Sequence, residues 1–128
     1  MTGAFSSTKN AIEITLTPYL STPLEEGADI VLHSATKYIG GHNDVLAGVV
    51  TVKDEQLAEQ LGQLHNMIGA TLSPFDSYLL QRGLKTLHLR MDRSEYNAKL
   101  LAERCNQLEA IDQVLYSGRT GMLSLRLN

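Results

Sequence analysis

Lys37 is the residue of this chain best placed for covalent chemistry, because of what surrounds it. The apolar run 30–32 predicts a buried strand that leads toward the lysine. Burial disfavours the charged form of a lysine, and a neutral lysine amine can form a Schiff base with a carbonyl. Gly40 and Gly41 follow and would let the backbone turn away tightly. Most lysines are solvated surface residues, so the local context alone leaves both interpretations open.

Two hydroxyl side chains flank this lysine. Ser34 and Thr36 are hydrogen-bond donors suited to a phosphate, and their alternative role is hydrogen bonding to backbone at a strand end. A carbonyl and a phosphate together describe pyridoxal 5'-phosphate (PLP). A PLP site is therefore one hypothesis, and the resemblance described next implies it, with Lys37 as catalytic and cofactor-binding residue and Ser34 and Thr36 as further cofactor-binding residues. The four histidines lack ligand spacing, so no metal site is predicted.

Residues 29–43 read Asp-Ile-Val-Leu-His-Ser-Ala-Thr-Lys-Tyr-Ile-Gly-Gly-His-Asn. This run resembles the PLP-attachment signature of the Cys/Met-metabolism enzymes, a family that includes cystathionine γ-synthase, cystathionine β-lyase, cystathionine γ-lyase and methionine γ-lyase. The similarity continues through 44–48, 66–70 and 80–87 and covers roughly residues 16–117. The resemblance implies that His42 supports the loop rather than acting in catalysis.

The resemblance implies a fold and an activity. The expected fold is α/β, part of the large PLP-binding domain of the aspartate aminotransferase-like type (fold type I). Residues 1–72 would belong to that domain, and residues 73–128 would lead into a C-terminal α+β part. The implied function is a PLP-dependent lyase or transferase of transsulfuration, acting by β- or γ-elimination or replacement. Its substrate would be a sulfur-containing amino acid or an activated homoserine ester, and its assembly a homo-oligomer, a tetramer in the parent family.

The chain also departs from the family, because it resembles only the middle third of such enzymes. Alignment on residues 17–20 places Ile12 where the family has the carboxylate that contacts the pyridine nitrogen, with Glu13 next to it. The ring-stacking aromatic, the glycine loop and the substrate-binding arginine of the family have no counterpart. We therefore expect a truncated chain that has little activity alone. The alternative is a non-catalytic α/β remnant, an interaction module or one piece of a split enzyme.

Composition excludes several classes of protein. The 128 residues carry a net charge of −3 and a pI of about 5.7, without a basic cluster, so no nucleic-acid partner is expected. The apolar runs are too short to span a bilayer, and residues 1–9 lack the apolar stretch of a signal peptide. Cys105 is a single cysteine, which favours a reducing, cytoplasmic location.

The elements expected to position the lysine follow from apolar spacing. The pattern predicts parallel strands at 28–34 and 45–52, with the lysine loop at 35–44 between them. Helices are predicted at 53–68, from Ser73 to Gly83 and, as a long amphipathic helix, at 84–108. A short helix is predicted to begin at Thr22, and a hairpin to join strands at 113–116 and 122–127.

Overall fold

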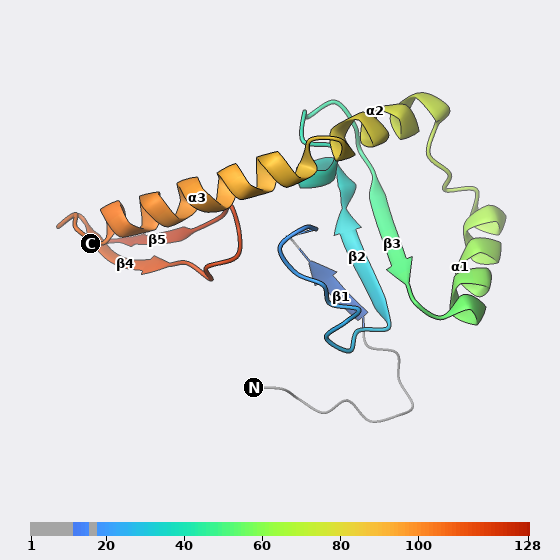
Figure 1. Cartoon of the computed structure of the whole chain (residues 1–128), viewed down its shortest axis with the longest axis horizontal. Coiled ribbons are helices and arrows are strands. Elements are labelled where there is room, and N and C mark those ends of the chain that lie inside the picture. Colours follow the sequence, from blue (N-terminus) through green and yellow to red (C-terminus); the bar gives the residue numbers. More distant parts are fainter. Residues whose placement is uncertain (1–11, 16–17) are drawn as a thin grey trace.

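The structure of the chain is a computed structural model that describes residues 12–15 and 18–128. The expectation about a signal peptide at residues 1–9 therefore falls outside the described residues. Three strands form one sheet in the order β1-β2-β3, and a separate two-stranded sheet, β4-β5, lies near the C-terminus. Figure 1 shows α3 running from the top of the three-stranded sheet to the β4-β5 hairpin, so the two sheets lie at opposite ends of this helix.

The three-stranded sheet is mixed rather than parallel. β1 (Ile12–Thr15) runs parallel to β2 (Ile30–Ser34), whereas β3 (Gly48–Val52) runs antiparallel to β2. The prediction of parallel strands is therefore wrong for β3. A strand that runs parallel to the one before it needs a long crossover connection, usually a full helix. The segment 35–47 between β2 and β3 holds only the one-turn helix η1 (Ala35–Ile39).

Helix α1 (Glu55–Ile68) confirms the predicted helix, and its apolar face is not buried. The Asp54 side chain accepts a hydrogen bond from the Leu57 amide at 2.7 Å, and Gly69 ends the helix with φ of 73°. None of its residues is buried, and Ile68 is 66% exposed. The apolar face of α1 therefore lies largely in contact with solvent.

The next two helices meet at a sharp junction. α2 (Pro74–Leu84) begins as predicted, because the Ser73 hydroxyl accepts a hydrogen bond from the Asp76 amide at 3.1 Å. α3 (Leu87–Cys105) begins later than predicted, after a two-residue turn. Its buried residues, which belong to the predicted amphipathic stripe or lie beside it, are Met91, Ala98 and Ala102.

The predicted hairpin is confirmed, and the predicted helix near Thr22 is wrong. β4 (Ile111–Leu115) pairs antiparallel with β5 (Ser124–Leu127). Residues 23–27 form a turn in which the Ala28 amide donates to the Pro23 carbonyl at 3.0 Å. Gly27, with φ of 106°, turns the chain before a second helical turn can form.

The main apolar core lies directly beneath the lysine turn. Five buried side chains from η1, the following loop and α2 form it: Ala35, Ile39, Val45, Leu79 and Leu80. Partly buried side chains from β3 and from the segment before α2 pack against this cluster. Among the described residues, no helix is long and apolar enough to cross a membrane.

Candidate functional site

The turn that carries Lys37 is anchored at both ends and presents the lysine outward. Within η1, Ala35 is fully buried and Ile39 is 6% exposed, whereas Lys37 between them is exposed. The Lys37 backbone has φ of −86° and ψ of −112°, which departs from helical values and interrupts the turn there. The lysine side chain is thus directed away from the core that fixes its neighbours. The sequence predicted a desolvated lysine, and the described residues leave it accessible.

Thr36 holds this turn against the strand that follows. Its Oγ1 accepts a hydrogen bond from the Ala47 amide at 2.9 Å and lies 3.3 Å from the Ala47 carbonyl, to which it can donate. The Thr36 amide also donates to the Ala47 carbonyl at 3.2 Å. This geometry favours the backbone-bonding role that the sequence left open for Thr36, because its hydroxyl proton is already used.

Ser34 differs from Thr36 in this respect. It is the last residue of β2 and the residue before η1, its side chain is exposed, and it makes no capping hydrogen bond to the turn. Its hydroxyl is therefore accessible to an anionic group at the edge of the sheet where Lys37 lies.

A cavity of about 780 Å³ lies beside the lysine turn. This volume is within the usual range for small-molecule sites, which is roughly 300–1,000 Å³. Its walls come from the η1 turn, the glycine loop after it, the first half of α3 and the segment before β5, and they include three cationic residues. The lining residues are Thr36, Lys37, Tyr38, Gly41, Asn43, Leu89, Arg90, Arg93, Ser94 and Met122.

Arg90 is a residue of this cavity that sequence reasoning missed. Its guanidinium donates to the carbonyls of Tyr38 at 2.5 Å and Gly83 at 2.8 Å, so it links the lysine turn to α2. Tyr38 is 52 positions away in sequence, and no local pattern signals a contact of that kind. His42, which was predicted to support the loop, has its Nδ1 2.7 Å from the Gly40 carbonyl.

The position aligned with the family's carboxylate lies away from the lysine edge. Ile12 is the first residue of β1 and pairs with Ile30, and Glu13 pairs with Val31. Because β1 and β2 are parallel, their C-terminal ends share an edge, and Ile12 lies about 10 Å back from it at roughly 3.3 Å per residue. The described residues thus provide an amine, a hydroxyl and cationic side chains that suit PLP. They do not provide the expected carboxylate for its pyridine nitrogen at this edge of the sheet.

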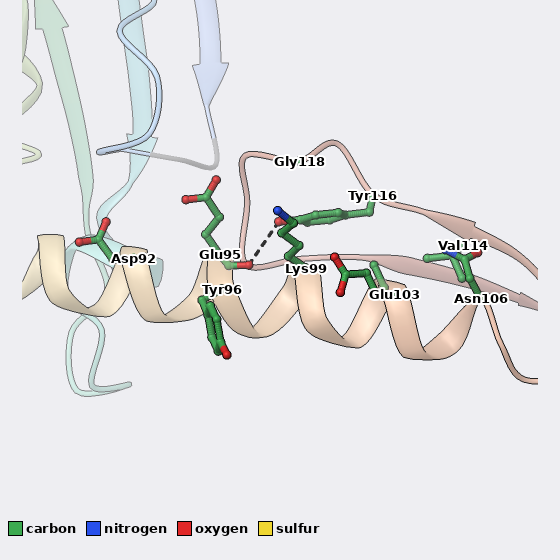
Figure 2. A pocket seen from close by; sticks show the side chains of 10 residues that line it. Asp92, Glu95, Tyr96, Lys99, Glu103, Asn106, Val114, Tyr116 and Gly118 are labelled. Carbon is green, nitrogen blue, oxygen red and sulfur yellow. Dashed lines mark hydrogen bonds between the residues drawn. The ribbon is translucent and has the colours of Figure 1, made fainter.

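A second cavity, of about 860 Å³, lies between α3 and the β4-β5 hairpin. Figure 2 shows Glu95, Lys99 and Tyr116 at this site, where the Tyr116 hydroxyl donates to the Glu95 carbonyl at 3.3 Å. Burial, followed by the nearby Glu95 carboxylate, raises the pKa of Tyr116 above its ordinary value. The described residues contain no cluster of three or more side chains suited to a metal ion.

Comparison with known families assigns the chain to a class. The family described as Cys/Met metabolism PLP-dependent enzyme matches residues 11–124. The chain therefore belongs to this family, whose members depend on PLP, and the resemblance noted in the sequence is confirmed.

Individual relatives show which enzymes of this family the chain is similar to. The chain is 61% identical over 111 residues to a cystathionine gamma-synthase/O-acetylhomoserine (thiol)-lyase of Bacillus subtilis, covering 87% of this chain and 30% of the relative. It is 55% identical over 102 residues to a cystathionine beta-lyase of Lactococcus lactis, covering 80% of this chain and 27% of the relative. The chain thus spans less than a third of the length of these relatives.

Solved structures show the same fold. Cystathionine gamma-lyase from yeast matches with a TM-score of 0.87 and 40% identity, over 92% of this chain and 35% of that one. Cystathionine gamma-lyase from Lactobacillus plantarum matches with a TM-score of 0.79 and 39% identity, over 83% of this chain and 32% of that one. The α/β chain described above is therefore part of a PLP-dependent enzyme fold of type I.

Proposed function

We propose that this chain is the lysine-bearing segment of a PLP-dependent C–S lyase or transferase of the cystathionine γ-synthase or β-lyase type. The observation that carries the proposal is Lys37, exposed on a turn with buried ends and beside a cavity that contains Arg90 and Arg93. The names of the relatives support a substrate of the cystathionine or homoserine-ester class.

The residues of the chain have distinct roles in this proposal. The Lys37 amine would attach the cofactor and, once released, would take and return a proton at the substrate's α-carbon. The Ser34 hydroxyl would donate to the phosphate, whereas Thr36 holds the turn through Ala47. When bound, PLP supplies an electron sink for the substrate carbon.

We further propose that these 128 residues alone bind PLP weakly and turn over little substrate. Ile12 stands at the family's carboxylate position, and Glu13 lies on the same strand, set back from the lysine edge. Without a carboxylate on the pyridine nitrogen, the electron sink is weakened. Adding PLP to the chain should therefore give only the absorbance of a generic lysine adduct, of equal size in Lys37→Ala.

A transplant into a longer relative tests both statements. The matched segment of the Bacillus subtilis relative is replaced by this chain, and γ-synthase activity is assayed. In the full-length frame of the relative we expect position 12 to reach the pyridine nitrogen, so the low activity should rise about a hundredfold or more with Ile12→Asp, which is the usual scale for one electrostatic contact to a transition state.

Lys37→Ala in the Ile12→Asp transplant is the matched control and should abolish activity. Activity that survives this change would refute the role of Lys37. A transplant that folds and binds PLP but stays inactive with Asp at position 12 would favour the alternative, a non-catalytic module.

A further inference from the structure

Arg90 connects three segments of the chain at the base of the η1 turn. Its Nη1 donates to the Tyr38 carbonyl at 2.5 Å. Its Nη2 donates to the Gly83 carbonyl at 2.8 Å and lies 3.4 Å from the Ile39 carbonyl. Its Nε donates to Thr86 Oγ1 at 3.1 Å. One guanidinium group therefore satisfies carbonyls from both the lysine turn and the end of α2.

Two glycines make this close approach possible. A Cβ atom at Gly83 would lie 2.5 Å from the Ile39 carbonyl oxygen and closer still to that of Gly40. Gly41 has φ of 76°, and a Cβ atom there would overlap the Arg90 guanidinium. The backbone of the lysine turn thus packs directly against the α2 backbone at Gly83. At Gly41 it packs against the Arg90 guanidinium.

We propose that Arg90 is a positioning residue that fixes the η1 backbone at Lys37 and so sets the direction in which the Lys37 side chain leaves the turn. It holds the two carbonyls directly after the lysine, those of Tyr38 and Ile39, and so restrains the backbone from which the amine projects. The functional meaning of this role rests on the proposed function of Lys37. Arg93 lines the same cavity but lies over the Tyr96 ring, 5.8 Å from its centre.

The planar, forked guanidinium is central to this proposal, because a lysine at position 90 would keep the charge and lose the geometry. If charge alone mattered, Arg90→Lys would behave like the parent chain. If the fork matters, Arg90→Lys resembles Arg90→Ala. Arg104→Ala is the matched control, since it removes an exposed arginine from the last turn of the same helix.

Amide hydrogen exchange of the chain without cofactor measures the restraint. The Gly40 amide donates to the Ala35 carbonyl at 2.7 Å and the Gly41 amide to the Lys37 carbonyl at 2.8 Å, so both report on η1. We expect protection of these two amides to fall about tenfold or more in Arg90→Ala and Arg90→Lys. Arg104→Ala should leave it unchanged, and millimolar methylguanidinium should restore much of it in Arg90→Ala only.

A chemical-shift signal separates positioning from general stabilisation. In NMR spectra, the Cα and Cβ resonances of Lys37, which report on its backbone conformation, should move toward random-coil values in Arg90→Ala. Those of Lys99, on the far half of α3, should stay in place. A general loss of stability would lower the melting temperature without this selective change.

Parent-like exchange at Gly40 and Gly41 in either Arg90 variant would overturn the proposal. If Arg90→Ala does not fold, hydrogen exchange of the parent chain in low concentrations of urea tests the same restraint. The amides of Gly40, Gly41 and Arg90 should then open with one shared free energy, and a separately opening turn would contradict the restraint. None of these measurements uses PLP, so an inactive transplant would count against the proposed function alone.

Discussion

The lysine turn and α1 are both helical, and they differ in what they bury. η1 is a single turn with no amphipathic pattern, yet Ala35 and Ile39 lie in the main core. α1 has a regular apolar face and buries none of its residues. Figure 1 shows α1 on the outer side of β3, the edge strand of the sheet, whereas η1 lies where β2, α2 and α3 meet. Periodicity therefore predicts that a helix forms, and its neighbours decide whether its face is covered.

Truncating one leucine in each region should give the largest difference in stability between the two regions. Leu80 in α2 is 9% exposed and packs in the core beneath the turn, and Leu64 in α1 is 50% exposed. We expect Leu80→Ala to lower the free energy of unfolding by about 2–5 kcal/mol. Leu64→Ala should change it by about 0.5 kcal/mol. Urea titration followed by circular dichroism measures both values, and similar losses would show that α1 is covered after all.

Adding one methyl group to a glycine in each region should give effects of opposite sign. Gly83→Ala would push a Cβ atom into the carbonyls of the lysine turn, and we expect a loss of about 1–3 kcal/mol. Gly62→Ala in α1 meets nothing within 4 Å and should gain about 0.5–1 kcal/mol from better helix propensity. The same urea titration applies, and a stabilising Gly83→Ala would contradict the close packing of α2 on η1.

The smallest effect is expected at the hairpin end of α3, far from the core. Because the pKa of Tyr116 is raised on folding, the folded state holds this proton more tightly than the unfolded state. Its contribution to stability is therefore complete below the ordinary pKa of 10.0 and is lost as pH rises through the higher folded value. The free energy of unfolding, measured from pH 8 upward, should decrease as the pH rises from the ordinary pKa of Tyr116 through its higher folded pKa.

Tyr116→Phe is the control for this pH dependence. The variant also lacks the hydrogen bond to the Glu95 carbonyl, so it should be slightly less stable at neutral pH. The part of the alkaline decline that belongs to Tyr116 should be absent, and an unchanged decline would assign it to other groups.

Local patterns predicted much of this chain, and long-range geometry accounts for the rest. The motif around Lys37, the helix start at Ser73 and the hairpin are properties of short segments, and the structure agrees with the elements they predict. The direction of β3 depends on how the chain returns after η1, which its apolar composition does not encode. The role of Arg90 depends on carbonyls more than fifty residues away, and a lone arginine gives no sign of them.

The antiparallel return of β3 has a consequence for the order of folding. β2, η1 and β3 are contiguous between Ile30 and Val52, so their pairing closes only a short loop and costs little chain entropy. The Arg90 contacts to the turn span more than fifty residues and cannot form until α3 has been synthesised. We therefore expect the lysine to enter an early hairpin-like unit whose turn is still mobile, and the backbone of this turn to become fixed in a late docking step.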